Sequence, residues 1–357
     1  MDNFKSFTNM LPKSDMWQYL RESDLPIILY GMGDGADKII RVLDDLGIKV
    51  SDIFASDEFV RGHSFHGFKV KKYSEICELY ENANVLLCFA ARTNELYERF
   101  DAISKRFDFF APDVPVVGKG LFTLEYFNEN ASKIKAADEM LSDDASRSAF
   151  ENIILYKLTG KIEYLRQADT DKGEAFNDVL CFTENEKFLD LGAYRGDTVE
   201  EFINVTKGKY ASILAVEPDL RSFNKLSAYL ENIPSSSALN CGISREDGEM
   251  LFSNKAGRMS SLDAEKGVLT KIRTIDTLCS DFDATYIKMD LEGEEKNALS
   301  GARETLKGKP KLLVSAYHRT EDIFELILLI NELNPSYKIY LRKHSYVPAW
   351  DINIYAI

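Results

Sequence analysis

A glycine-rich turn stands at residues 190–196, where an apolar run ends in the order Asp190-x-Gly192-x-x-x-Gly196. Such a turn lets a ligand approach the backbone. The helix that follows, with Asp197 or Thr198 as its expected cap, offers free N–H groups at its start. Glu217 comes 21 residues beyond Gly196, at the end of the next apolar run. A carboxylate there can accept hydrogen bonds from two ribose hydroxyls, so the pattern indicates a nucleoside-containing cofactor.

The charge of this segment favours one cofactor over the others. The sequence has no Gly-x-x-x-x-Gly-Lys-Ser/Thr phosphate loop, and Asp190 and Asp197 would repel a pyrophosphate. S-adenosylmethionine (SAM) is cationic and carries no phosphate, so it suits an acidic pocket. For the glycine pair alone, an ordinary strand–helix turn that binds nothing is the alternative. The residues expected to contact SAM are Asp190, Gly192, Ala193, Tyr194, Gly196, Asp197, Thr198, Glu217, Pro218, Asp219, Asn240, Gly242 and Asp290.

The elements expected around this turn form an alternating α/β unit that starts at Lys187. Apolar runs predict strands at 188–191, 213–216, 238–241, 286–289 and 312–316. Helices between strands imply a parallel sheet with right-handed crossovers, and ligands bind beyond the carboxyl ends of such strands. The last two apolar runs, 337–341 and 352–357, are separated by a short turn and predict an antiparallel pair at a sheet edge.

A smaller α/β unit is expected before this one. Its first strand, at 27–30, runs into the glycine-rich residues 31–35 and a helix, and further strands are expected at 50–54 and 85–90. The segment from 121 to 180 is charged, lacks β-branched runs and shows helical spacing. The expected organisation is a Rossmann-like accessory domain at 1–120, a helical connector at 121–180 and a SAM-binding domain at 181–357.

The ligand of the first unit stays open. Gly31-x-Gly33-x-x-Ala36 resembles a dinucleotide fingerprint, but only Asp57 offers an acid near the end of the second strand. The spacing of Gly62, Phe65, Gly67 and Val70 resembles small Rossmann-like domains found beside sugar-processing enzymes. Three alternatives follow: an architectural unit that binds nothing, a site for an acceptor or a nucleotide sugar, or a site for NAD.

Several blocks of the second unit, in order, resemble the FkbM-type SAM-dependent methyltransferases, over about residues 150–357. The blocks are Phe188–Thr198, Ala215–Asp219, Ile287–Glu295 with Leu299–Ala302, Ser315–Asp322 and Leu341–Ser345. The resemblance implies a class I methyltransferase domain, with a seven-stranded mixed sheet that has helices on both faces. It also implies O-methylation, typically of a glycan or a natural-product precursor.

The implied reaction needs groups that position and deprotonate the acceptor. A sugar hydroxyl is a poor nucleophile, and a positioned base is expected to accelerate the transfer by roughly 10²–10⁴-fold. His318 and His344 fall at strand ends on the ligand side, and imidazole titrates near neutrality. For each, a hydrogen bond to a neighbouring loop is the alternative. Asp290 could orient the acceptor, act as the base or bind a cation with a neighbour.

The expected roles of these residues can be stated together. The expected catalytic residues are His318, Asp290 and His344, and the expected acceptor contacts are Glu292, Tyr317 and His344. The sequence shows no compact cluster of histidine, aspartate and glutamate, so no metal site is expected.

Composition limits the class of protein. The chain has 44 lysine and arginine residues and 58 aspartate and glutamate residues, so its net charge is 44 − 58 = −14. This negative charge disfavours non-specific binding to nucleic acid. The five cysteines are scattered, as in reduced cytosolic proteins, and no apolar run has the length of a membrane span or a signal peptide. The expected protein is cytoplasmic, with a small-molecule or glycan acceptor and with homo-oligomerisation left open. The competing functions are a nucleotide-sugar or dinucleotide enzyme acting through the first unit, and a non-catalytic protein with a degenerate methyltransferase fold.

Overall fold

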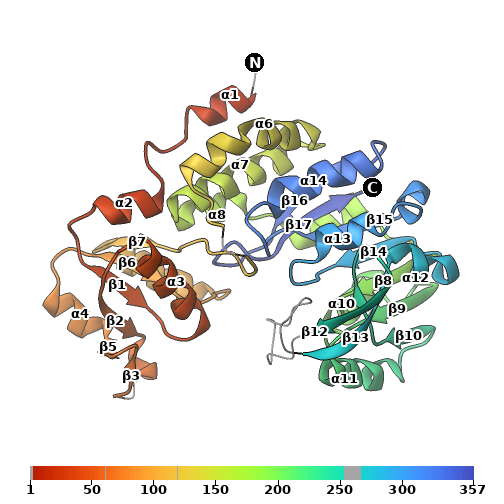
Figure 1. Ribbon diagram of the computed structural model, residues 1–357, viewed down its shortest axis with the longest axis horizontal. Coiled ribbons are helices and arrows are strands. Elements are labelled where there is room, and N and C mark those ends of the chain that lie inside the picture. Colours follow the sequence, from red (N-terminus) through yellow and green to blue (C-terminus); the bar gives the residue numbers. More distant parts are fainter. Residues whose placement is uncertain (1–2, 61, 119, 253–266) are drawn as a thin grey trace.

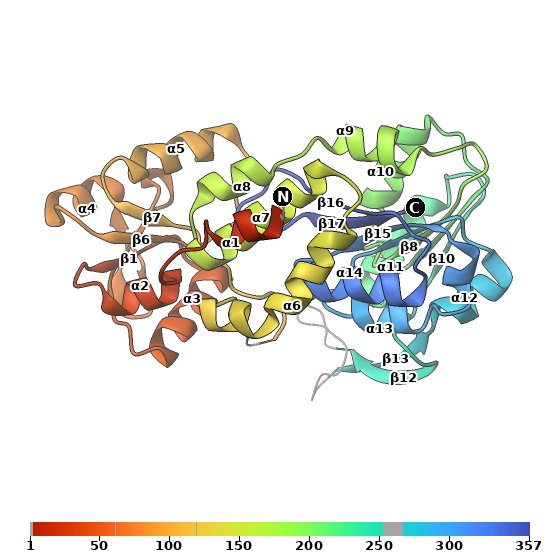
Figure 2. The same ribbon diagram turned by 90° about the horizontal axis from the view of Figure 1, so that it is seen from above.

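The computed structural model describes residues 3–60, 62–118, 120–252 and 267–357. Two α/β units lie side by side, and a group of helices lies between them (Figures 1 and 2). The first two helices of the chain are α1 (Asn3–Thr8) and α2 (Met16–Glu22). No helix in the described residues is both long enough and apolar enough to cross a membrane.

The first unit is built on a five-stranded parallel sheet in the order β5-β2-β1-β6-β7. Its strands are β1 (Ile27–Tyr30), β2 (Val50–Ala55), β5 (Lys71–Lys72), β6 (Asn84–Leu87) and β7 (Asp108–Phe110). Its helices are α3 (Asp34–Asp45), α4 (Tyr73–Leu79) and α5 (Asn94–Ser104), with a short 3₁₀ turn at Asp57–Phe59 and a hairpin of β3 (Ser64–Phe65) and β4 (Phe68–Lys69). The three strands predicted in this unit are confirmed, although β6 ends earlier than expected.

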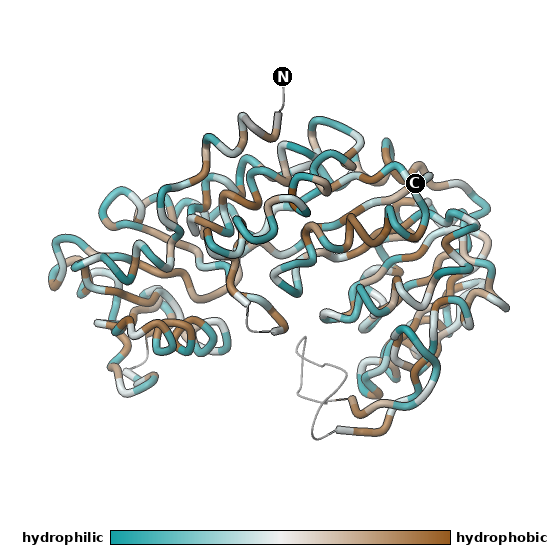
Figure 3. Tube along the Cα trace, turned by 45° about the horizontal axis from the view of Figure 1, so that its top comes forward, coloured by the Kyte–Doolittle hydropathy of each residue, from teal (hydrophilic) through white to brown (hydrophobic). Residues whose placement is uncertain are grey.

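The segment after the first unit is helical, as its spacing predicts. It holds α6 (Leu124–Met140), α7 (Asp144–Thr159), α8 (Ile162–Ala168) and α9 (Lys172–Glu174), followed by a π-helical turn at Ala175–Leu180. Helix α6 packs on the apolar helix α14 (Asp322–Leu333), and α7 packs on an edge strand of the second sheet (Figure 3). A single buried apolar cluster therefore runs from the first unit through these helices into the second unit.

The second unit has a seven-stranded mixed sheet in the order β10-β9-β8-β14-β15-β17-β16. Its strands are β8 (Lys187–Leu191), β9 (Ser212–Val216), β10 (Ser236–Leu239), β14 (Tyr286–Met289), β15 (Lys311–Ser315), β16 (Ile339–Lys343) and β17 (Ile352–Ala356). The first five are parallel, whereas β17 runs antiparallel to both β15 and β16. The predicted strands and the antiparallel pair at the edge are confirmed. The remaining helices are α10 (Asp197–Thr206), α11 (Leu220–Leu230), α12 (Ile275–Phe282) and α13 (Glu295–Ser300), with a 3₁₀ turn at Thr305–Gly308.

The structure adds a three-stranded sheet that the sequence did not predict. It consists of β11 (Gly242–Ile243), β12 (Gly248–Phe252) and β13 (Val268–Arg273), with β13 in the middle. Two features hide it in the sequence. Strand β11 has only two residues, and much of β12 and β13 is exposed, so neither shows a clear buried face.

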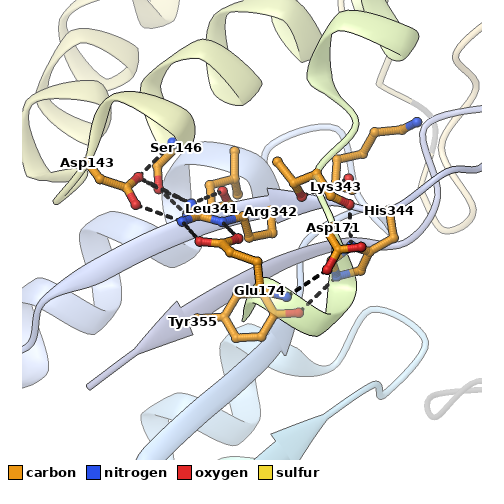
Figure 4. Close-up of polar contacts among 10 residues, drawn as sticks. Asp143, Ser146, Asp171, Glu174, Leu341, Arg342, Lys343, His344 and Tyr355 are labelled. Carbon is orange, nitrogen blue, oxygen red and sulfur yellow. Dashed lines mark hydrogen bonds and ion pairs between the residues drawn. The ribbon is translucent and has the colours of Figure 1, made fainter. Parts of the chain in front are cut away.

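A buried arginine fastens the helical segment to the edge strand β16. The side chain of Arg342 is 1% exposed and forms ion pairs with Asp143, at 2.7 Å, and with Glu174, at 2.9 Å (Figure 4). Its guanidinium also donates to Ser146 Oγ at 2.7 Å. Asp143 in turn caps α7 by accepting from the Ser146 N–H. One guanidinium thus joins the sheet edge, the start of α7 and the short helix α9.

Removal of this guanidinium should destabilise the protein strongly. Arg342→Ala is expected to lower the free energy of unfolding by about 3 kcal/mol, because two partly buried carboxylates lose their counter-charge. Urea unfolding followed by circular dichroism measures this. Lys307→Ala is the matched control, since Lys307 and Glu304 form an exposed pair that contributes about 0–1 kcal/mol. An effect of Arg342→Ala as small as that of the control would contradict the assignment.

Candidate functional site

The candidate site is a cavity of about 540 Å³ at the carboxyl ends of the parallel strands in the second unit. The turns after β8, β9, β14 and β15 form its floor, and the segment between β16 and β17 forms one wall. Of the described residues of the first unit, Arg92 lines the cavity. The cavity therefore lies where the sequence places a ligand site, but it has a wall that the second unit does not supply alone.

The turn after β8 is shaped by its contact with strand β14. Gly192 has φ +78°, and a Cβ atom there would lie 1.9 Å from the backbone carbonyl oxygen of Asp290. The Asp290 N–H donates to Leu191 O at 3.1 Å, and Lys288 Nζ donates to Gly192 O, also at 3.1 Å. Glycine is required at this position because two strand ends meet. Gly192 also lines the cavity, so its expected contact with a ligand stays a prediction beside this structural role.

Asp190 stands behind the cavity. Its side chain is fully buried, lies 3.3 Å from Lys288 Nζ and accepts a hydrogen bond from Thr198 Oγ1. Burial alone would lower the pKa of Lys288, but the carboxylates of Asp190 and Asp290 outweigh burial and raise that pKa. Lys288 therefore stays charged, and the pair holds the turn rather than a ligand.

Three more residues that were predicted to touch the cofactor form hydrogen bonds with backbone groups of the neighbouring turns. The Ala193 N–H donates to Val216 O at 3.0 Å, and the Gly196 N–H donates to Ala193 O at 2.8 Å. The side-chain amide of Asn240 donates to Glu217 O at 2.8 Å and to Pro218 O at 3.1 Å. With Asp190, they lie outside the lining of the cavity, whereas the other predicted cofactor contacts line it: Gly192, Tyr194, Asp197, Thr198, Glu217, Pro218, Asp219, Gly242 and Asp290.

The start of α10 differs from the expected cap. Gly196, with φ +96°, occupies the N-cap position, and the helix begins at Asp197. Neither Asp197 nor Thr198 caps the helix, because the Thr198 hydroxyl is used by Asp190. The first N–H groups of α10 are therefore not blocked by a capping side chain.

Glu217 is the buried carboxylate of the cavity. It is 7% exposed, and its two oxygens accept from the N–H groups of Tyr194 and Asp219, each at 2.8 Å. Burial raises the pKa of Glu217 to about 7, although the two backbone hydrogen bonds oppose that shift. Each carboxylate oxygen has a second lone pair, so Glu217 can still accept hydrogen bonds from a ligand.

Acidic groups gather around His318 at the ends of β14 and β15. His318 Nε2 lies 3.4 Å from Asp290 Oδ1 and 3.8 Å from Glu292 Oε2, and its Nδ1 lies 2.9 Å from Glu295 Oε1. Tyr317 donates from its hydroxyl to Asp290 Oδ1 at 3.2 Å. Asp290, Glu292 and Tyr317 line the cavity, whereas the histidine is 1% exposed and lies behind them.

The structure argues against His318 as the base. Burial alone would lower the pKa of His318, but the carboxylates of Glu295, Asp290 and Glu292 outweigh burial and raise it to about 9. An imidazole with this pKa already carries its proton near neutrality. Moreover, it does not line the cavity. The predicted role is therefore corrected.

His344 has a structural position. One ring nitrogen lies 3.2 Å from Thr170 O and the other 3.0 Å from the Tyr355 hydroxyl (Figure 4). Burial lowers the pKa of His344, so the ring is neutral and can donate to the first and accept from the second. His344 lies outside the lining of the cavity. Its predicted roles as base and as acceptor contact are both corrected.

The sequence missed an aromatic and basic wall. The guanidinium of Arg92 lies 4.3 Å from the centre of the Tyr346 ring, and Trp350 packs against the same ring at 5.5 Å. Two backbone hydrogen bonds between Ala91 and Val347, of 2.7 and 3.0 Å, bring the first unit to this wall. Tyr346 and Trp350, two aromatic residues in the segment after His344, could have indicated this wall from the sequence. No local pattern in the sequence links them to Arg92.

Comparisons with known proteins can be set beside this geometry. Residues 190–339 match the family model of the methyltransferase FkbM domain. The crystal structure of methyltransferase FkbM from Methylobacillus flagellatus is 22% identical, with a TM-score of 0.78 over 100% of this chain and 98% of that chain. No curated protein matches the chain.

Two shorter similarities concern about half of the chain. Precorrin-6y C5,15-methyltransferase from Geobacter metallireducens is 11% identical, with a TM-score of 0.35 over 53% of this chain and 93% of that chain. Fibrillarin from Aeropyrum pernix, in complex with SAM, is 11% identical, with a TM-score of 0.33 over 52% of this chain and 73% of that chain. The family match and the full-length similarity together confirm the resemblance read from the sequence and the class I methyltransferase fold.

The contact between β8 and β14 can be tested with a pair of glycine variants. Gly192→Ala is expected to lower the free energy of unfolding by about 2–5 kcal/mol, from the left-handed backbone and the forced contact with Asp290 O. Gly208→Ala is the control, since Gly208 has a similar φ of +72° with no atom within 4 Å of the added Cβ. Gly208→Ala should lower the free energy of unfolding by only about 1–2 kcal/mol. Equal losses in urea unfolding would show that the strand contact is unimportant.

Proposed function

We propose that this chain, whose residues 190–339 match the family model of the methyltransferase FkbM domain, transfers a methyl group from SAM to a hydroxyl oxygen of a sugar-containing acceptor. The observation that best supports SAM as the cofactor is the position of Glu217. This buried carboxylate is fixed by two backbone N–H groups and lines the cavity. The acceptor is assigned to the part of the cavity between Asp290 and the wall of Arg92, Tyr346 and Trp350.

The cavity residues suit SAM chemically. Glu217 can accept from ribose hydroxyls, and Asp197 and Asp219 add negative charge that favours a cationic ligand. No side chain caps the start of α10, so its N–H groups are available for a carboxylate. When bound, SAM would supply an electrophilic methyl group, already activated by its sulfonium.

The acceptor side offers alignment rather than a strong base. Lys288 and His318 outweigh burial and hold the pKa of Asp290 below its usual range, so that carboxylate stays ionised. An ionised Asp290 can accept a hydrogen bond from an acceptor hydroxyl and orient its oxygen, which is the main requirement of an in-line displacement. Tyr317, which donates to Asp290, fixes the direction of that carboxylate.

The wall of Arg92, Tyr346 and Trp350 supports an acceptor that contains a sugar ring. Trp350 is partly exposed and packs on the buried Tyr346, and its flat apolar surface with a polar edge suits a ring that has both C–H faces and hydroxyl groups. Arg92 supplies hydrogen-bond donors from the first unit. Through Arg92 and the Ala91–Val347 bonds, the first unit takes part in the acceptor site, and this is the role we propose for it.

Glu217 provides the test of the cofactor assignment. Glu217→Gln is expected to weaken SAM binding roughly 10- to 100-fold, because charge-assisted hydrogen bonds contribute about 1.5–3 kcal/mol. Isothermal titration calorimetry measures the affinity. In the wild type, affinity should rise as pH increases through about 7, because the Glu217 carboxyl ionises there and its anion is the better acceptor. The variant should lack this dependence, and unchanged affinity and pH profile would place the cofactor elsewhere.

Trp350 provides the test of the acceptor wall. Trp350→Ala is expected to raise the acceptor KM about tenfold, because a stacked ring contributes about 1–1.5 kcal/mol, while SAM affinity stays unchanged. The assay measures release of S-adenosylhomocysteine with a panel of nucleotide sugars and oligosaccharides. Phe59→Ala is the matched control, since Phe59 is an aromatic residue that is 60% exposed in the first unit and absent from the cavity lining. A normal KM for Trp350→Ala would remove this wall from the acceptor site.

A further inference from the structure

Buried polar atoms crowd together behind the floor of the cavity. Oε2 of Glu295 has no hydrogen-bond partner, and the ring nitrogens of His318 face carboxylates, with Nδ1 2.9 Å from Glu295 Oε1 and Nε2 3.4 Å from Asp290 Oδ1. Both side chains are 1% exposed, so water does not satisfy these atoms from the surface. An unpaired buried polar group costs about 1–3 kcal/mol, so a ligand that satisfied Glu295 Oε2 among these crowded carboxylates would be favoured.

The atoms are spaced as ligands of one ion would be. One ligand atom each from Asp290, Glu295 and His318 can be chosen so that all three lie within 4.8 Å of one another. Atoms that share a cation at about 2.1 Å are separated by roughly 3–4 Å, so a small contraction would close the set. The distance of 3.4 Å between His318 Nε2 and Asp290 Oδ1 already falls in this range. Glu292 Oε2, 3.8 Å from Nε2, is a fourth group within reach.

The local charge is also unbalanced. Asp290, Glu292 and Glu295 surround His318, and the buried Asp322 lies close enough for its carboxyl to feel the imidazole. Within the described residues, Lys288 also acts on Asp290 but forms its ion pair with Asp190, and Arg319 donates to Gly293 O. One protonated imidazole does not balance Asp290, Glu295 and Asp322 together.

We propose that Asp290, Glu295 and His318 bind a divalent cation of the Mg²⁺ or Mn²⁺ type, with Glu292 as an additional ligand. Carboxylates suit both ions, and the imidazole favours Mn²⁺ over Mg²⁺. Binding releases the imidazole proton, since the ligand nitrogen must be neutral. Asp290 and Glu292 line the cavity, so the ion would border the acceptor and keep positions open towards it.

The ion would activate the acceptor hydroxyl, because the acceptor side of the cavity offers no strong base. Coordination would lower the pKa of the acceptor hydroxyl and favour loss of its proton to solvent as the bond to the methyl group forms. This role rests on the proposed function. The binding site itself can be tested without SAM or acceptor, so failure of one proposal is distinguishable from failure of the other.

The test uses the full chain after treatment with a chelator, with Mn²⁺ alone as the probe. Loss of the electron paramagnetic resonance signal of free Mn²⁺ measures bound ion, and one ion per chain is expected. Mg²⁺ should compete for the same site. No binding at millimolar Mn²⁺ would overturn the proposal and leave the imidazolium as the occupant of the cluster.

Three variants locate the ion. Asp290→Asn and Glu295→Gln should each weaken Mn²⁺ binding at least tenfold, and both preserve side-chain size. Asp290 is only partly buried, so Asp290→Asn keeps the test valid if the buried Glu295→Gln fails to fold. Asp351→Asn is the control, since Asp351 also lines the cavity but lies outside the cluster, and its Mn²⁺ affinity should be unchanged. Unaltered affinity in Asp290→Asn, or equal losses in all three variants, would also overturn the assignment.

Discussion

The approach of strands β8 and β14 to each other, where Gly192 meets the carbonyl of Asp290, sets the relative position of the two turns at the centre of the site. It brings the turn that leads to Tyr194 beside the strand end that carries Asp290, although about a hundred residues separate them in the chain. The ion pair of Asp190, on β8, and Lys288, on β14, joins the two strands and adds hydrogen bonds to Gly192 O and the Thr198 hydroxyl in the segment after β8. The proposed cofactor and acceptor regions can share one cavity because these two turns are held at a fixed separation.

Charge divides the cavity into two regions with different chemistry. Near Glu217 a single carboxylate is desolvated and fixed by backbone N–H groups, which suits the recognition of neutral hydroxyls. Near His318 several carboxylates face one imidazole, an arrangement that needs added positive charge. The two regions meet at Asp290. This residue stands at the end of β14, beside the turn that leads to Tyr194, and it also belongs to the group of carboxylates around His318. A ligand that bridges the regions would therefore pass this carboxylate.

The sequence predicted the fold, and most of the residues that line the proposed cofactor region, because both depend on local patterns. Apolar runs, glycine positions and the distance from Gly196 to Glu217 are all readable along the chain. The acceptor side was predicted poorly because its members come together only in the fold. Arg92 meets Tyr346 through a contact between units, and His344 is drawn into a structural hydrogen bond by the returning strand β17. Glu295 was missed because it looks like an ordinary helix residue until its neighbour across the sheet, His318, is placed.

The two backbone hydrogen bonds between Ala91 and Val347 have a mechanical consequence. A rotation of the first unit against the second must either carry the segment after β16 with it or break these bonds. A ligand that displaced Arg92 or Tyr346 would therefore exert a torque on the first unit. By reciprocity, any molecule that fixed the orientation of the first unit would alter the affinity of the cavity for its acceptor. The orientation of the first unit can thus be coupled to ligand binding in the cavity, even if this unit carries no reactive group of its own.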